Sequence, residues 1–171
     1  MGENMMRDGI SVIDTCKELE QRGADVVGMN CFRGPNTMMP YLKNIRKAIT
    51  CHMAALPIPF RTTEAQPTFF NLDDNNKCSC PSPHGRTFPT ALDPLYCNRY
   101  EIRQFAEEAH ALNIKYLGVC CGAAPMHIRE VAEAVGREVP ASRYREKMSN
   151  HFMYGTNKRI PEHISGYGDK A

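Results

Sequence analysis

The chain has 171 residues, a net charge of +2, 42% hydrophobic residues and 23% charged residues. This length is enough for one domain with a hydrophobic core. No block of Lys and Arg marks a nucleic-acid surface, and no apolar run approaches the ~20 residues of a membrane span, so we expect neither partner. Eight cysteines and an N-terminus without a signal peptide favour a reducing compartment, and we predict a cytoplasmic protein.

A predicted helix and a predicted buried strand begin the chain. Residues 10–22 have helical spacing, and Ser11 with Asp14 three residues later forms an imperfect capping box. The apolar face of this helix carries Val12, Cys16 and Leu19. Residues 24–31 are mostly apolar and bounded by glycine, which is typical of a buried parallel strand, and Cys31 ends this strand.

A second helix and a weaker strand precede a long irregular stretch. The helix is predicted from four apolar residues at helical spacing, Met38, Leu42, Ile45 and Ile49. Residues 53–58 predict a weak strand that Pro57 interrupts. Residues 60–97 have no strong period, and loops of this length are usually functional or disordered.

The third helix, third strand and fourth helix follow closely. Asn98 with Glu101 starts the clearest helix, and the apolar run 114–119 predicts a strand. The apolar stripe of the third helix is Ile102, Phe105, Ala106, Ala109 and Leu112. Pro125 begins the last helix, because proline suits the first helical position. Its inward residues are predicted to be Ile128, Val131, Ala132 and Val135.

Helices and strands alternate along the chain, which predicts an α/β fold with a parallel sheet and right-handed crossovers. We expect one domain at residues 1–139 and a polar C-terminal tail at residues 140–171. Three strands are few for a complete α/β domain, because they leave an outer strand edge unpaired.

Two adjacent cysteines, Cys120 and Cys121, end the third strand and precede Gly122. Neighbouring cysteines are poor disulfide partners, because consecutive Cα atoms lie ~3.8 Å apart and an unstrained disulfide needs roughly 4.4–6.8 Å. At a strand end, with a glycine free to turn, both sulfurs can reach one ion. The pair therefore predicts two ligands of a thiolate metal site that needs at least one more.

Five short motifs carry a family resemblance. Residues 118–122 followed by 125–129 resemble the last strand and helix of homocysteine S-methyltransferases, and residues 28–31 resemble the sixth strand of the same barrel. Residues 99–103 and 140–142 are most similar to the betaine-dependent branch of that family.

The resemblance covers about residues 8–145 and implies the C-terminal half of a (β/α)₈ TIM barrel, from its fifth helix through its eighth. It implies transfer of a methyl group from betaine to the thiol of L-homocysteine, giving methionine and dimethylglycine. The chain would be a fragment or short isoform, and we expect a homo-oligomer or a partner that supplies the missing strands. The alternatives are another methyl donor, the homocysteine-binding part of a methionine synthase, and a non-catalytic half-barrel.

The resemblance assigns one zinc ion per chain to Cys31, Cys120 and Cys121, which all lie where barrel active sites lie, at the carboxyl ends of strands. Three protein ligands leave a fourth tetrahedral position for the homocysteine sulfur. Asn30 and Gly122 are candidate substrate-binding residues. Tying adjacent loops is an equal alternative for Asn30, and a plain strand-to-helix turn is the alternative for Gly122.

The other cysteines have simpler interpretations. Cys78 and Cys80 are predicted to be loop residues, with a second metal site shared with His84 as the alternative. Packed positions are predicted for Cys16, Cys51 and His127. Candidates for covering the site or anchoring the long loop are Phe69, Phe70 and Phe88.

Overall fold

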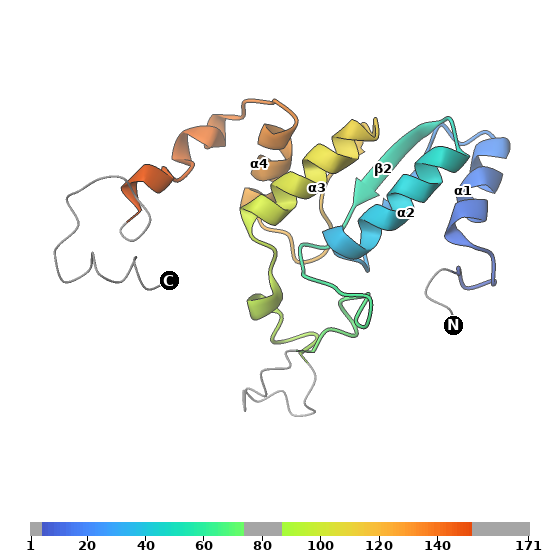
Figure 1. Ribbon diagram of the computed structural model, residues 1–171, viewed down its shortest axis with the longest axis horizontal. Helices are drawn as coiled ribbons and strands as arrows, with labels where there is room; N and C mark the ends of the chain where they lie inside the picture. Colours follow the sequence, from blue (N-terminus) through green and yellow to red (C-terminus); the bar gives the residue numbers. More distant parts are fainter. Residues whose placement is uncertain (1–4, 74–86, 152–171) are drawn as a thin grey trace. The chain divides into compact units, whose positions relative to one another are not determined.

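The computed structural model describes residues 5–73 and 87–151 (Figure 1). Three parallel strands form a sheet in the order β1-β2-β3: β1 (Val26–Asn30), β2 (His52–Leu56) and β3 (Tyr116–Leu117). The helices are α1 (Val12–Gln21), α2 (Pro35–Ala48), α3 (Arg99–Ala111) and α4 (Pro125–Ala134), and a 3₁₀ turn, η1 (Asp93–Leu95), precedes α3. The predicted alternation of helices with parallel strands is confirmed.

Side-chain caps begin two of the helices at the predicted residues. The Ser11 hydroxyl accepts a hydrogen bond from the Asp14 N–H at 3.0 Å at the start of α1. At the start of α3, Asn98 Oδ1 accepts from the Glu101 N–H at 3.0 Å, and Glu101 Oε2 accepts from the Asn98 N–H at 2.7 Å. This reciprocal pair satisfies backbone donors that a helix start leaves unpaired. Prolines occupy the first turns of α2 and α4.

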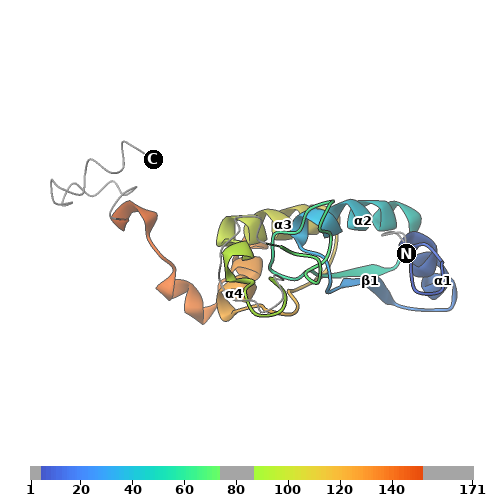
Figure 2. The ribbon, with the colours of Figure 1, turned by 90° about the horizontal axis from the view of Figure 1, so that it is seen from below.

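The two faces of the sheet differ in their cover. The register pairs Val27 with Met53, and it puts Val26 and Tyr116 on the opposite side, because alternate strand residues face opposite ways. Helices α2 and α3 lie along one face (Figure 2), and Val27 and Met53 are buried there. On the other face Val26 is 49% exposed and Tyr116 is 62% exposed.

The main hydrophobic core lies between the sheet and helices α2 and α3. Its fully buried side chains include Met38, Leu42, Ile45, Met53, Ile102 and Ile114. Fully burying a side chain of this size contributes roughly 1.5–3 kcal/mol. The predicted apolar stripes of the second and third helices are therefore confirmed as core, apart from Leu112, which is only partly buried.

The strand predictions need two corrections. The run 24–31, expected to be a wholly buried strand, is a strand over Val26–Asn30 with one exposed face. The run 114–119 is a strand only over Tyr116–Leu117, because β3 pairs with β2 alone and, among the described residues, has no partner on its outer edge.

Two predicted inward residues lie on exposed helix faces instead. Leu19 is 45% exposed, and Cys16 is the one residue of α1 that is buried. Ile128 is 50% exposed, because α4 buries His127, Glu130 and Val131 while it packs against α3.

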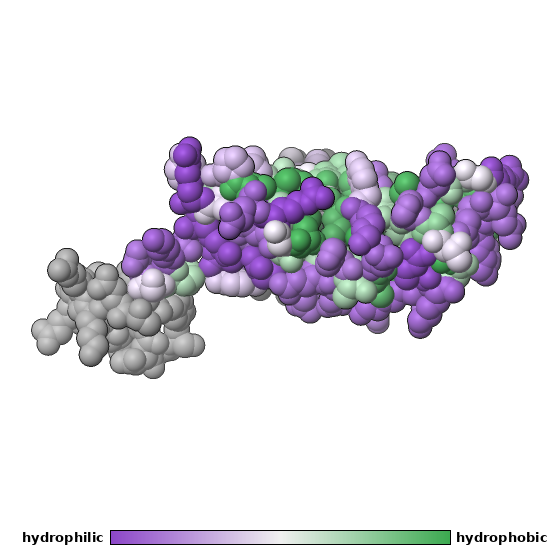
Figure 3. Space-filling model, turned by 90° about the horizontal axis from the view of Figure 1, so that it is seen from above, coloured by the Kyte–Doolittle hydropathy of each residue, from purple (hydrophilic) through white to green (hydrophobic). Residues whose placement is uncertain are grey.

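Figure 3 shows apolar surface in green gathered in the middle of the view from above. Apolar side chains thus remain on the surface of the described residues.

The chain divides into two compact units, Met1–Val139 and Pro140–Ala171. The described residues of the second unit form two 3₁₀ turns, η2 (Pro140–Tyr144) and η3 (Met148–Asn150). Within the described ranges, no helix combines the length and the apolar character that crossing a lipid bilayer requires.

Candidate metal centre

The carboxyl end of the sheet brings three cysteines together. Hydrogen bonds of the parallel ladder continue past the strand ends on both sides of β2. The Cys31 N–H donates to the Leu56 carbonyl at 2.8 Å, and the Cys120 N–H donates to the Pro57 carbonyl at 2.8 Å. Because Leu56 and Pro57 are consecutive residues, the two cysteines sit at nearly the same level of the sheet, and Cys121 follows directly.

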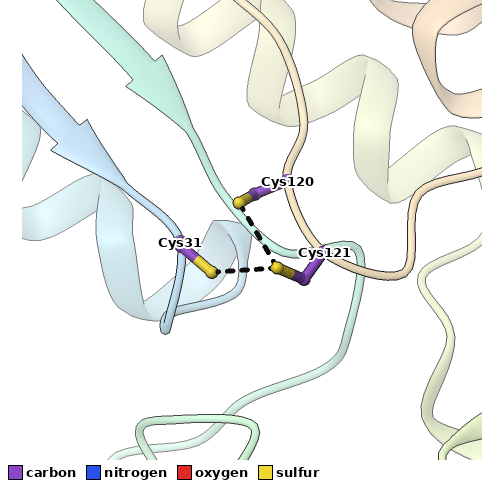
Figure 4. Close-up of side chains that lie close together, drawn as sticks. All are labelled: Cys31, Cys120 and Cys121. Carbon is purple, nitrogen blue, oxygen red and sulfur yellow. Dashed lines mark hydrogen bonds between the residues drawn. The ribbon is translucent and has the colours of Figure 1, made fainter.

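The three sulfur atoms converge on one point (Figure 4). Cys31 Sγ lies 3.5 Å from Cys121 Sγ, and Cys120 Sγ lies 3.8 Å from Cys121 Sγ. All three sulfurs lie within 4.8 Å of one another. Tetrahedral Zn–S bonds of ~2.3 Å separate two sulfurs by ~3.8 Å. The cluster thus has the spacing of a tetrahedral thiolate site.

The first cysteine lies in an unusual backbone turn. Cys31 has φ 67° and Phe32 has φ 63°, and non-glycine residues uncommonly adopt this left-handed region. The Arg33 N–H donates to the Cys31 carbonyl at 2.7 Å, and the Phe69 N–H donates to the Phe32 carbonyl at 3.0 Å. Such strain persists only where the surrounding structure enforces it, and it concentrates at functional sites. It therefore supports a functional reading of this strand end.

The second and third cysteines lie in a tight turn. The Ala123 N–H donates to the Cys120 carbonyl at 3.0 Å, which closes the turn. Gly122 has φ 84°, and a Cβ there would lie 2.7 Å from two ring carbons of Phe60. Glycine is required both by the left-handed backbone and by the close ring. This observation explains Gly122 through the turn, and its role with substrate stays a prediction.

The thiols influence one another's ionisation. Burial raises the pKa of the Cys31 thiol, but hydrogen bonds from Cys120, the Phe32 backbone N–H and Cys121 outweigh burial and hold that pKa below its usual value. Burial, followed by hydrogen bonding to Cys31, raises the pKa of Cys120 to about 12. Of Cys31 and Cys120, it is therefore Cys31 that ionises first. Holding all three sulfurs as thiolates requires a nearby cation, because like charges this close disfavour each other.

A second apolar cluster packs against the cysteines of the site. Its buried members are Ile58, Phe60 and Leu72, and Cys31 and Cys120 pack against it. Beside it, the Phe32 ring lies 6.3 Å from Phe69 and 5.5 Å from Phe70, and Phe88 lies 5.1 Å from Phe69 and 4.8 Å from Phe70, between ring centroids. These rings join the turn after Cys31 to both described ends of the long loop, which supports their predicted anchoring role.

The remaining sequence predictions have mixed outcomes. Cys16 is 3% exposed and His127 is 1% exposed, so their packed positions are confirmed, while Cys51 is only partly buried. Asn30 is the exposed last residue of β1, and both of its hypotheses stay predictions. Cys78, Cys80 and His84 lie outside the described residues.

Sequence reasoning missed the aromatic side chain that contacts the di-cysteine turn. The Tyr96 hydroxyl donates a hydrogen bond to the Gly122 carbonyl. Tyr96 reaches this place because its backbone forms an antiparallel bridge with Phe60 across the long loop. No periodic pattern in the sequence signals such a contact.

The fold and the cluster define an α/β protein with a candidate thiolate metal centre at the carboxyl end of a parallel sheet. The chain belongs to the homocysteine S-methyltransferase family, since the model of the family described as Homocysteine S-methyltransferase matches residues 1–135. The resemblance seen in the sequence motifs is confirmed at the level of the family.

Curated relatives agree with this family. The chain is 37% identical over 124 residues to betaine–homocysteine S-methyltransferase 1 of Danio rerio. The aligned region is 70% of this chain and 28% of the relative. It is 28% identical over 137 residues to the Xenopus tropicalis protein of the same name, over 77% of this chain and 31% of the relative. It is 30% identical over 127 residues to an S-methylmethionine–homocysteine S-methyltransferase of Mus musculus, over 71% of this chain and 31% of the relative. The chain thus spans about 30% of the length of these relatives.

Proposed function

We propose that the chain is part of a zinc-dependent enzyme that transfers a methyl group from betaine to the thiol of L-homocysteine, giving methionine and dimethylglycine. The observation that carries this proposal is the convergence of Cys31, Cys120 and Cys121 in a member of this family. Three sulfur donors at tetrahedral spacing suit Zn²⁺, and three protein ligands are typical of a catalytic zinc with an open position.

Cys31, Cys120 and Cys121 would hold the ion. A bound zinc would keep the substrate thiol, whose free pKa is roughly 8.5, in its thiolate form at neutral pH. In the transfer, the homocysteine sulfur forms a bond to the methyl carbon, the C–N bond of betaine breaks, and its electron pair stays on nitrogen. Asn30, the exposed last residue of β1, directly precedes Cys31, and we propose that Asn30 and Gly122 contact homocysteine.

Aromatic rings next to the cluster support a positively charged methyl donor. Phe32 directly follows Cys31 and is 53% exposed, and Phe70 is 47% exposed. Aromatic faces attract quaternary ammonium groups by roughly 0.5–2 kcal/mol. Relatives are named for betaine and for S-methylmethionine, which both carry the methyl group on a positively charged atom. The rings therefore favour this class of donor, and we propose betaine within it.

The uncovered sheet face supports an incomplete barrel. Val26 and Tyr116 are exposed on the side that would face the interior of a (β/α)₈ barrel. We propose that residues 1–139 form the second half of such a barrel, with residues 140–171 as a tail, and that further strands cover this face. The same exposed face favours a second candidate function, a non-catalytic half-barrel that pairs with a longer relative.

Methionine formation from homocysteine and methyl-labelled donor tests the function. The chain is assayed with zinc and either betaine or S-methylmethionine, alone and together with the barrel segment of the Danio rerio relative that it does not match. We expect turnover only in the mixture, because in-line positioning of donor and nucleophile is worth roughly 7–11 kcal/mol and needs the whole mouth of the barrel. We expect betaine to be the better donor.

The Cys121→Ser variant in the same mixture is the control and should be inactive. A mixture that assembles and binds zinc but forms no methionine contradicts the enzymatic proposal and favours the non-catalytic half-barrel. Zinc-dependent turnover by the chain alone would contradict the need for further strands.

A further inference from the structure

The position of Cys121 depends on a short exposed turn. Cys121 is exposed, yet its sulfur is the one that lies within 3.8 Å of both other sulfurs. Within the turn, the Ala123 N–H to Cys120 carbonyl bond restrains the backbone. Exposed turns of this kind are conformationally free unless other parts of the protein fix them. What fixes this turn therefore decides whether the third ligand is in place.

Tyr96 holds one side of the turn. Its hydroxyl donates to the Gly122 carbonyl, and its ring lies 4.7 Å from the Phe60 ring, between centroids. The backbone around Tyr96 is itself fixed, because the Arg61 N–H donates to the Leu95 carbonyl and the Cys97 N–H donates to the Pro59 carbonyl, each at 2.8 Å. A rigid support of this kind can position the turn.

His127 holds the end of the turn at Ala124. Its Nδ1 accepts a hydrogen bond from the Ala124 N–H at 2.9 Å, so the ring is neutral with its proton on Nε2. Its ring is 1% exposed and stacks on Tyr96, with 5.4 Å between centroids and 6° between planes. Burial lowers the pKa of His127, which keeps the ring neutral and Nδ1 able to accept.

We infer that Tyr96 and His127 are a stacked pair of positioning residues that fix the turn 120–124, so that the Cys121 sulfur meets those of Cys31 and Cys120. This inference rests on the proposed metal centre. The two polar groups bond the same short turn at two points, the Gly122 carbonyl and the Ala124 N–H. Packing alone would not select His127, because an apolar ring fills the same buried space without the cost of burying a polar group.

Metal affinity tests the pair in the full chain. Zn²⁺ affinity is measured by competition with a chromophoric chelator, and Co²⁺ absorption reports the number of thiolate ligands. Tyr96→Phe removes the hydroxyl but keeps the stacked ring. His127→Phe keeps a ring without the acceptor, and His127→Asn restores an acceptor near the position of Nδ1. The matched control is Tyr116→Phe, which removes a hydroxyl from a tyrosine 62% exposed on β3.

We expect Tyr96→Phe and His127→Phe each to weaken Zn²⁺ binding by roughly 10-fold or more, as loss of residues that orient metal ligands does. The Co²⁺ thiolate charge-transfer band should fall in both variants, while the helical circular dichroism signal stays unchanged. His127→Asn should recover affinity relative to His127→Phe, and Tyr116→Phe should match the wild type. If His127→Phe does not fold, Tyr96→Phe still decides the outcome.

Equal Zn²⁺ affinity and equal Co²⁺ spectra in the wild type, Tyr96→Phe and His127→Phe would overturn the positioning role while leaving the metal centre intact. Weaker binding accompanied by an equal loss of folded protein would also overturn it, because that is the result of packing alone. A wild-type chain that binds neither metal would contradict the proposed centre itself.

Discussion

The two faces of the three-stranded sheet differ in how far their side chains are buried. The face against α2 and α3 buries Val27 and Met53, and the opposite face leaves Val26 and Tyr116 largely exposed. Both faces carry apolar residues, although the open face also carries Asn30 and His52, so the faces differ in cover and in part in composition. The stability of the described chain therefore resides on the helix side, while the open side is the place where we propose further barrel strands.

The cysteine cluster resembles the covered face of the sheet, because packed structure supports it. Its backbone is anchored to Leu56 and Pro57 at the end of β2, and its sulfurs rest on the apolar cluster around Phe60. The thiol geometry is thus complete within the described residues, although the sheet beside it is open. The comparison teaches that the proposed metal binding and the proposed catalysis can have different structural requirements.

The largest expected effect compares one substitution on the two faces of β1. Val27→Thr puts a hydroxyl into the core at a position that an apolar side chain fills in the wild type. The change should lower the free energy of unfolding by roughly 1–3 kcal/mol. Val26→Thr keeps the same shape on the exposed face and should change it by less than about 0.5 kcal/mol. Urea unfolding followed by circular dichroism measures both. Equal losses would show that the open face is covered in solution.

A smaller effect concerns the start of α3, on the covered side. Burial raises the pKa of Glu101, but hydrogen bonds from Arg61 and the Asn98 N–H outweigh it and hold that pKa below its usual value. The stabilisation is therefore complete above the unfolded pKa of about 4.3 and is lost as the pH falls through the folded pKa. Glu101→Gln keeps an acceptor for the Asn98 N–H but loses the charge that pairs with Arg61, and it should lower stability at pH 7 by about 0.5–2 kcal/mol.

The pH profile of unfolding checks this assignment. Glu101→Gln should lose part of the acid sensitivity of the wild type below about pH 4.3. Glu107→Gln, on an exposed position of the same helix, is the control and should keep the wild-type profile. An unchanged profile in Glu101→Gln would mean that the charge of Glu101 does not stabilise α3.

The smallest effect concerns the outer surface of the covered side. Lys43 Nζ on α2 lies 2.9 Å from Glu108 Oε2 on α3, and the two side chains are 50% and 37% exposed. Lys43→Gln should cost less than about 1 kcal/mol, because exposed ion pairs contribute little. The difference should shrink further in 1 M salt, which unfolding at two salt concentrations measures. A cost like that of Val27→Thr would mean that the two helices depend on charge more than on their core.

Much of the fold follows from local pattern in the sequence. Helical spacing places α2 and α3 and their buried stripes, and Asn98 with Glu101 marks the start of α3. The exposure of Val26 and Ile128 cannot be predicted from this pattern. An apolar residue at a regular position is buried only if a neighbouring element covers it. The extent of β3 fails for the same reason, since pairing on one edge defines a short strand.

The candidate site is only partly predictable. Cysteines at strand ends can be placed at the same edge of a parallel sheet from the sequence, and the three sulfurs do converge. The contact of Tyr96 with Gly122 spans 26 residues and depends on how the long loop folds back. Local pattern contains no information about that path. The buried acceptor of His127 likewise emerges only once the turn before α4 is seen.

The measurement that tests the central claim most directly is the zinc content of the purified chain. Metal analysis should find about one zinc per chain in the wild type, because three thiolates at tetrahedral spacing form a sufficient set of protein ligands. Cys121→Ser should lose most of it, while Cys16→Ser, at a buried cysteine far from the cluster in sequence, should retain it. Full zinc retention in the Cys31→Ser, Cys121→Ser double variant would contradict the claim and move the site elsewhere, with Cys78 and Cys80 the next candidates.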